Sequence, residues 1–203
     1  MSDPLTTWQC LREGNERLFV PTRGDRGKPL VHRPVAAVFR CADAALGSEL
    51  VFGQSRDRLL EVSTWGHVID AGVLATMEYA VQTLEVPLIV VLGHGDCPAM
   101  RAAMQAWDDA VIPEGATRTA VQQALSSIVR RGAGADSLAG VTAAHLVETG
   151  VALTERSPRI SRRIDDGKCG IVCATVDPET GRLRTHATIG PVGQMPDTLL
   201  ECV

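Results

Sequence analysis

An amphipathic helix that runs directly into a short apolar strand is the feature that most constrains the fold of this chain. Apolar residues recur at helical spacing from Asp70 to Leu84, and Val86–Gly93 is an almost wholly apolar run typical of a buried strand. Similar short runs span Pro34–Cys41 and Arg58–Ser63. Because neighbouring parallel strands need a crossover helix, the pattern predicts an α/β fold built on a mainly parallel sheet.

The stretch that follows the third strand is predicted to be mainly helical. Ala and Gln are frequent from Ala99 to Arg131, with a break at residues 112–115. Residues 132–140 are predicted to form a loop, and two further helices are predicted at His145–Arg156 and Pro158–Ile164.

The C-terminal part of the chain predicts a β-hairpin. Cys169–Asp177 and Arg182–Ile189 are rich in strand-forming residues, and a Gly-containing turn, Pro178–Gly181, joins them. One antiparallel edge strand is therefore expected on the parallel sheet, with helices flanking the sheet.

The chain divides into an N-terminal segment, 1–34, and a single α/β domain, 35–203. The first segment combines a predicted helix at Thr7–Phe19 with an arm rich in Gly and Pro at Pro21–Pro34. This segment has no obvious core of its own, so we expect it to lie across a partner subunit in an oligomer.

Composition excludes several classes of protein. The longest apolar run, Val86–Leu92, is far shorter than the ~20 residues of a membrane span. The first residues do not resemble a secretory signal, which predicts a cytoplasmic protein. The net charge of -4, from 24 acidic and 20 basic residues, argues against nucleic acid as a partner. A small-molecule substrate is expected instead.

Reactive side chains gather where two predicted strands end. The first strand ends in Cys41-Ala42-Asp43, and the third ends just before His94-Gly95-Asp96-Cys97. Ligands of open α/β sheets bind beyond the carboxyl ends of the strands, and two thiolates with one imidazole suit Zn2+. Spacing alone leaves open the alternative that Cys41, His94 and Cys97 are ordinary core residues. Asp96 is interpreted as a turn residue that caps the following helix.

Further motifs make the chain resemble the β-carbonic anhydrases. They are Cys41-Ala42-Asp43, His94-x-x-Cys97, Gly66-His67-Val68-Ile69-Asp70, Met77-Glu78-Tyr79-Ala80-Val81 and the strand that runs into His94. The resemblance is specific from Val35 to Met100 and looser from Trp8 to Gly190.

The resemblance implies a zinc enzyme that hydrates carbon dioxide reversibly to bicarbonate. It implies that Cys41, His94 and Cys97 bind Zn2+, which lowers the pKa of a bound water. Asp43 would orient the resulting hydroxide, and Gln54 would donate a hydrogen bond to bicarbonate. The resemblance also implies a homodimer or homotetramer.

One departure from the family falls beside the predicted metal. The family pattern is Cys-x-Asp-x-Arg, in which the arginine holds the aspartate away from zinc, but this chain has Ala45 at the arginine position. Arg40 is not expected to replace it, because neighbouring residues of a strand point to opposite faces. An unpaired carboxylate beside a divalent cation tends to bind it, so Asp43 is a candidate fourth ligand.

Other departures are predicted to line the substrate pocket around Gly66. Ser63 replaces a typical arginine, Trp65 replaces a small residue, and Pro98 removes a backbone N–H donor near the metal. Arg40 and Ser55 also replace small residues.

Three hypotheses therefore stay open. The first is a carbonic anhydrase, with hydration expected to be weak or lost; the second is a zinc enzyme repurposed for another small electrophilic or carboxylated substrate; the third is a non-catalytic, zinc-stabilised oligomer. Whether the chain is an enzyme is left open. Four histidines without paired ligand spacing are left unassigned: His32, His67, His145 and His186.

Overall fold

A computed structural model describes residues 34–54, 56–132 and 136–192. Five strands form one sheet in the order β2-β1-β3-β4-β5. Their bounds are β1 (Ala36–Cys41), β2 (Leu59–Thr64), β3 (Leu88–His94), β4 (Gly170–Val176) and β5 (Leu183–Ile189). All neighbours pair in parallel except β4 and β5, which pair antiparallel at the edge. The predicted fold class is confirmed.

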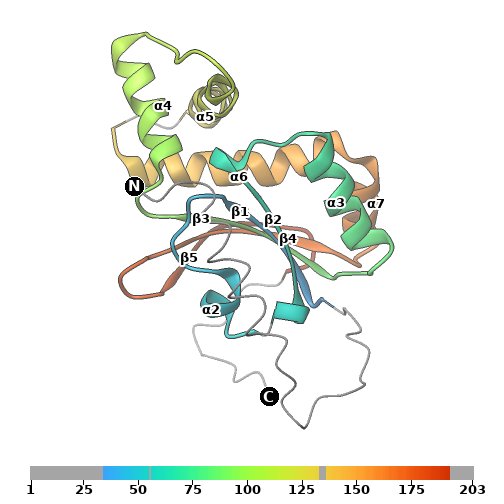
Figure 1. Cartoon of the computed structure of the whole chain (residues 1–203). Helices are drawn as coiled ribbons and strands as arrows, with labels where there is room; N and C mark the ends of the chain where they lie inside the picture. The colour runs from blue at the N-terminus through green and yellow to red at the C-terminus, as the bar shows by residue number, and fades with distance from the viewer. Residues whose placement is uncertain (1–33, 55, 133–135, 193–203) are drawn as a thin grey trace, which may run out of the picture. The chain divides into compact units, whose positions relative to one another are not determined.

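Helices cover both faces of this sheet (Figure 1). The longer helices α3, α6 and α7 lie on one face and the short α2 on the other, while α4 and α5 form a hairpin that packs on α6. Their bounds are α2 (Ser48–Phe52), α3 (Ala71–Gln82), α4 (Pro98–Asp109), α5 (Thr117–Arg131), α6 (Leu138–Arg156) and α7 (Pro158–Asp165). Two single-turn 3-10 helices are η1 (Arg56–Arg58) and η2 (Trp65–His67). None of the helices in the described ranges is long and apolar enough to cross a membrane.

The direction in which the chain adds strands to the sheet reverses at β1, and this reversal positions the site. The chain leaves β1 for β2 on one side and returns past β1 to β3 on the other, so β1 is paired with both. The carboxyl ends of β1 and β3 are therefore neighbours at the point where the two connections diverge. Such a point forms a crevice in open α/β sheets.

Apolar packing continues beyond the strand ends into the helical layer. On the side of α3, α6 and α7, Phe39 and Ile89 pack with Met77 and Leu153. At the carboxyl edge, Cys41 and Cys97 belong to a second cluster, which is formed largely by α4, α5 and α6. Both thiols are buried.

Two sequence predictions are wrong in detail. The helix predicted from His145 begins at Leu138, inside the predicted loop, because the Ser137 hydroxyl caps it by accepting the Gly140 N–H at 3.1 Å. Asp96 does not cap α4, whose N-cap is Cys97; its carboxylate pairs with Arg101 instead. The short α2 was not predicted. The N-terminal helix and arm lie outside the described residues, Pro34 apart, so the division into 1–34 and 35–203 stays a prediction.

A buried histidine follows the β2 strand. Gly66 and His67 both have positive φ, 65° and 54°, in the η2 turn. The His67 Nε2–H donates to the Leu92 carbonyl at 3.0 Å, and the ring meets Phe39 edge-on with centroids 5.2 Å apart. Burial lowers the pKa of His67 to about 3.

This shift predicts acid sensitivity. The unfolded chain takes up a proton at His67 below its ordinary pKa of 6.5, whereas the folded chain does so only near 3. The contribution of His67 to stability is therefore complete above pH 6.5 and is lost as the pH falls towards 3, by at most about 1.4 kcal/mol per pH unit. Asn accepts positive φ and does not titrate, so His67→Asn should flatten this part of the curve. Urea unfolding at several pH values tests this; parallel curves for the two proteins would contradict it.

Candidate metal centre

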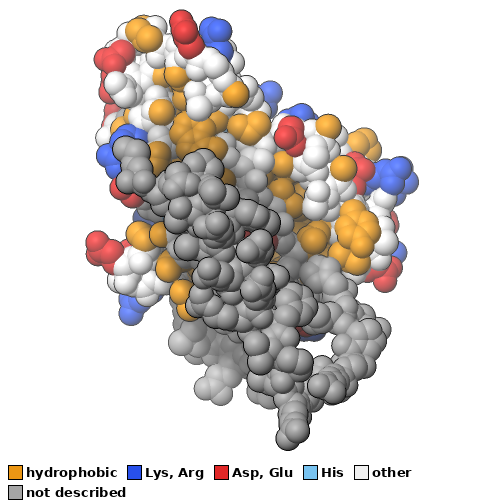
Figure 2. Space-filling view, in the orientation of Figure 1, with side chains coloured by type: hydrophobic (Ala, Val, Ile, Leu, Met, Phe, Trp, Pro, Cys, Tyr) orange, Lys and Arg blue, Asp and Glu red, His pale blue; other side chains and the backbone are white. Residues whose placement is uncertain are grey.

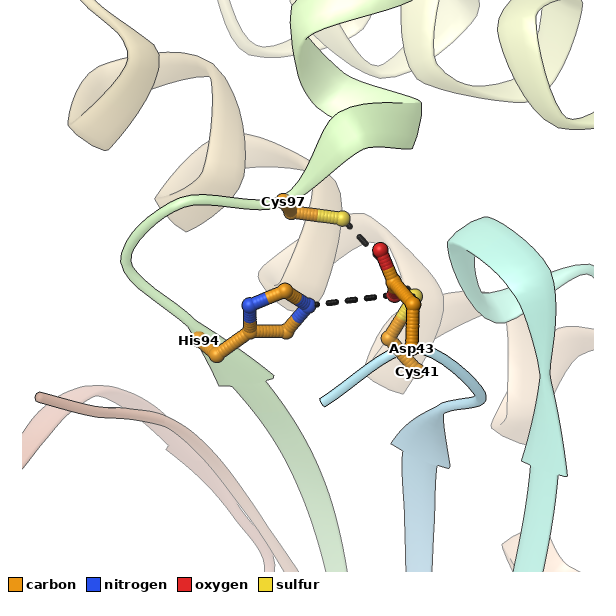
Figure 3. A group of neighbouring side chains, drawn as sticks. All are labelled: Cys41, Asp43, His94 and Cys97. Carbon is orange, nitrogen blue, oxygen red and sulfur yellow. Dashed lines mark hydrogen bonds and ion pairs between the residues drawn. The ribbon is translucent and has the colours of Figure 1, made fainter. Parts of the chain in front are cut away.

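Four potential metal ligands converge at the carboxyl ends of β1 and β3 (Figure 3). Cys41 ends β1, Asp43 follows in the next turn, His94 ends β3, and Cys97 is the N-cap of α4. Their ligand atoms all lie within 4.8 Å of one another. The sequence prediction that these segments meet at one point is therefore correct.

The Asp43 carboxylate lies among the other three ligands. Its Oδ1 accepts a hydrogen bond from Cys41 Sγ at 2.7 Å and lies 3.2 Å from His94 Nε2. The two sulfur atoms, on Cys41 and Cys97, are 3.7 Å apart. Two sulfurs, one imidazole nitrogen and one carboxylate oxygen form a donor set that suits tetrahedral zinc.

The two thiols of the site have opposite pKa shifts. Hydrogen bonding with Cys97, together with burial, raises the pKa of Cys41, whereas the same hydrogen bond lowers the pKa of Cys97. Hydrogen bonding with Cys41 also raises the pKa of His94, although burial opposes this. The pair therefore retains a proton that a divalent cation would displace, because metal ligands bind deprotonated.

Backbone N–H groups support both sulfur atoms. The Gly66 N–H donates to Cys41 Sγ at 3.1 Å. The N–H groups of Met100 and Ala99, at the start of α4, lower the pKa of Cys97. Pro98 occupies the first turn of α4, where an N–H has no partner within the helix, so its lack of a donor is tolerated there.

Arg40 is engaged away from the carboxylate, as predicted. Its guanidinium pairs with Glu61 at 3.3 Å and donates to the carbonyl of Ala44. Within the described residues, Asp43 contacts Cys41 and His94 but no arginine. Arg40 thus supports the loop that carries Asp43 without pairing with its carboxylate.

A small cavity of about 280 Å³ opens beside Asp43 and His94. Its other lining residues are Ala44, Ala45, Leu46, Asp96, Pro98, Val176 and Pro178. The wall is mainly apolar, and Ala45 stands in it where the family pattern has an arginine. The cavity therefore suits a small molecule of low polarity.

The other predicted pocket residues lie elsewhere. Trp65 lines a separate cavity, and Ser63 is exposed on the edge strand β2. Gly66 is buried and contacts Cys41 through its N–H, while Gln54 lies just after α2, and its amide reaches the Phe52 carbonyl at 3.5 Å. Of the predicted substrate-pocket set, only Pro98 lines the cavity beside Asp43.

Two histidines that the sequence analysis left unassigned lie in or against the η2 turn, next to the candidate metal ligands. His67 and His145 are both buried, and their rings are 6.1 Å apart. Neither has the spacing of a metal ligand, so ligand patterns could not have found them. The one available signal was the position of His67 directly after Gly66, within a motif shared with the family.

Comparison with known proteins identifies the family. A family model described as carbonic anhydrase matches residues 36–183. Carbonic anhydrase 2 of Mycobacterium tuberculosis is 37% identical over 202 residues, covering 95% of this chain and 98% of the relative. A carbonic anhydrase of Mycolicibacterium smegmatis is 36% identical over 203 residues, covering 96% and 98%.

Solved structures share the fold. A Coccomyxa β-carbonic anhydrase in complex with acetazolamide matches with a TM-score of 0.68 at 17% identity, over 91% of this chain and 86% of that one. A tetrameric β-carbonic anhydrase of Sordaria macrospora matches with a TM-score of 0.65 at 18% identity, over 89% and 91%. The chain belongs to the β-carbonic anhydrase family.

Gly66→Ala should weaken metal binding. A Cβ at this position would lie 2.9 Å from the Ala99 Cβ and 3.0 Å from the Ala120 Cβ, and φ is +65°. The turn must therefore shift, which moves the N–H away from Cys41. We expect zinc affinity to fall ~10–100-fold, as when a partner of a metal ligand is lost.

Competition with a chromophoric chelator measures this affinity. Gly181→Ala is the matched control, because Gly181 also has positive φ (+69°) but its added Cβ would meet nothing within 4 Å. Equal zinc affinity in the Gly66 and Gly181 variants would show that the close packing of this turn does not support the site.

Proposed function

We propose that the chain binds one Zn2+ per subunit through Cys41, His94 and Cys97, with Asp43 as the fourth donor. Its proposed reaction is the reversible hydration of carbon dioxide to bicarbonate. We expect this reaction to be slow near neutral pH. The observation that carries this proposal is the contact of Asp43 Oδ1 with both Cys41 and His94, at 2.7 and 3.2 Å. The carboxylate lies among the donors rather than beside them.

In the described part of the chain no arginine or lysine contacts Asp43, which supports the closed arrangement. Two thiolates neutralise a divalent cation, so the Asp43 carboxylate makes the cluster negative, and only a cation or a strong donor would draw it away. Arg40 is the nearest arginine along the chain, and its guanidinium contacts Glu61 and Ala44 instead.

The side chains support hydration chemistry once the carboxylate moves. When bound, zinc acts as a Lewis acid that makes a water nucleophilic at neutral pH. The Gly66 N–H and the start of α4 stabilise the two thiolates. Asp43 can accept a hydrogen bond from a donor at the site, and the mainly apolar cavity can admit carbon dioxide. Gln54 stays a predicted donor to bicarbonate, although it does not line this cavity.

A repurposed enzyme is the second candidate. The observation that favours it is the cavity of about 280 Å³ with Ala45 in its wall, which leaves room for a substrate larger than carbon dioxide. A small electrophilic or carboxylated molecule would fit this space. A non-catalytic, zinc-stabilised oligomer is the third candidate. An Asp43 carboxylate that stays bound to zinc under all conditions would favour it.

Ala45→Arg should accelerate hydration. A guanidinium at this position can pair with Asp43 and release the fourth position, so we expect stopped-flow hydration at pH 7 to rise ~10–100-fold over the natural chain, at equal zinc content. Ala45→Met is the matched control, because it adds similar length without charge and should stay at the natural rate.

Fast hydration by the natural chain would contradict the closed arrangement. If the purified protein holds no stoichiometric zinc and cannot be loaded with it, the metal assignment itself is wrong. If Ala45→Arg frees Asp43 and hydration stays absent, the repurposed enzyme becomes the better account.

We also propose a homodimer or homotetramer in the cytoplasm. A tetrameric relative from Sordaria macrospora supports the first part. Figure 2 shows apolar side chains on the surface of the α4–α5 hairpin, where Trp107 and Val111 are 48% and 67% exposed. Among the residues that the structure describes, the cysteines are buried free thiols, which supports a reducing compartment: Cys41, Cys97, Cys169 and Cys173.

Analytical ultracentrifugation tests the assembly. We expect a dimer or tetramer at micromolar concentration, because the exposed apolar side chains and the Gly- and Pro-rich arm favour burial against another copy. A monomer under these conditions would overturn this proposal without affecting the metal site.

A further inference from the structure

A hydrogen-bonded histidine connects helix α6 to the metal-site turn. His145 is 2% exposed, although it lies 79 residues from Gly66 in sequence. Its Nε2 lies 2.9 Å from the Gly66 carbonyl oxygen, and its Nδ1 lies 3.0 Å from the Ser127 hydroxyl oxygen. Both ring nitrogens therefore have partners, on two different elements.

The hydrogen bonds fix the tautomer of this ring. A carbonyl oxygen only accepts, so Nε2 must carry the proton that it donates to Gly66. Burial lowers the pKa of His145, so the ring is neutral and Nδ1 is an acceptor. The single Ser127 hydroxyl hydrogen can go to the Gln123 carbonyl at 2.9 Å or to Nδ1 at 3.0 Å. The carbonyl already accepts the helical N–H four residues on, whereas the buried Nδ1 has Ser127 as its one partner within the described residues, so donation to Nδ1 leaves neither acceptor without a hydrogen bond. The Ser127 hydrogen therefore goes to Nδ1.

The Gly66 peptide transmits this contact to the metal ligand. Its carbonyl accepts from His145 while its N–H donates to Cys41 Sγ at 3.1 Å. Gly66 has positive φ and packs closely against Ala99 and Ala120, so little room is left for this turn to shift without a change in the direction of its N–H. His67 ties the next residue of the same turn to Leu92, two residues before His94.

We propose that His145, oriented by Ser127, is a positioning residue of the metal site: it holds the Trp65–His67 turn so that the Gly66 N–H points at Cys41. This inference rests on the proposed zinc site. A thiolate that accepts an N–H donor gives less charge to its metal, so loss of the donor changes both the metal affinity and the metal–thiolate spectrum.

The contact does more than satisfy a buried ring. An uncharged apolar side chain could fill the same volume, yet this ring on α6 reaches two other elements, α5 and η2, through directed hydrogen bonds. A cavity of about 350 Å³ adjoins Ser127 and His145, so the ring is not enclosed by packing on every side. Its orientation therefore depends on the two hydrogen bonds.

Cobalt substitution gives the test, because Co2+ takes zinc sites and its thiolate charge-transfer absorption reports on the Cys41 and Cys97 bonds. His145→Leu should raise the Co2+ dissociation constant ~10–100-fold and shift this absorption. His145→Gln keeps an amide N–H that can reach a carbonyl, so it should recover much of the affinity. His186→Leu, on β5 and bonded to Thr175, is the control and should match the natural chain.

Ser127→Ala keeps the test decisive if His145→Leu does not fold. This variant leaves the imidazole in place but no longer fixes which ring nitrogen carries the proton. It should therefore change the Co2+ affinity and the absorption in the same direction as His145→Leu, but by less. If the folded Ser127→Ala and His145→Leu proteins bind Co2+ with the affinity and absorption spectrum of the natural chain, the inference about His145 is wrong, whereas the proposed zinc site stands. A natural chain that binds no Co2+ or Zn2+ would overturn the proposed metal site, and the inference with it.

Discussion

The adjacency of the carboxyl ends of β1 and β3 is the constraint on which the rest of this structure depends. Because the sheet changes direction at β1, the last residue of one strand, Cys41, meets the last residue of its neighbour, His94. The start of α4 then adds Cys97 from three residues further on. Three donors from two strand ends reach one point without any long-range loop, so the sheet topology itself determines the metal chemistry that the chain can support.

A second layer of contacts decides how the donors behave. Backbone N–H groups of Gly66 and of the first turn of α4 favour charged sulfur, and Arg40 fixes the loop that carries the carboxylate. In the described part of the chain, the arginine contact that the family pattern would give Asp43 is absent, and the carboxylate turns towards the donors instead. On the proposed function, a single side chain, Ala45, makes the difference between an open and a closed coordination position, while Cys41, His94 and Cys97 still lie together.

Much of this architecture is predictable from sequence. Continuous apolar runs of the length typical of buried strands locate β1 and β3. The residue types at the ends of these strands locate the candidate ligands. Local capping contacts were harder to predict: Ser137 begins α6 early, and Asp96 pairs with the Arg101 side chain on α4 rather than capping that helix. The role of His145 was not predictable, because its contact with Gly66 joins distant segments by packing and leaves no trace in spacing. Motif spacing reports on ligands within one segment, whereas the groups that orient them come from elsewhere in the fold.

The crystal structure of the zinc-loaded natural chain at pH 7 tests the central claim most directly. We expect Zn2+ bound by Cys41, His94 and Cys97, with an oxygen of Asp43 as the fourth ligand at about 2.0–2.2 Å. Zinc with water in the fourth position, and Asp43 turned away to another partner, would contradict the closed site. Zinc bound at other residues would contradict the metal centre as a whole.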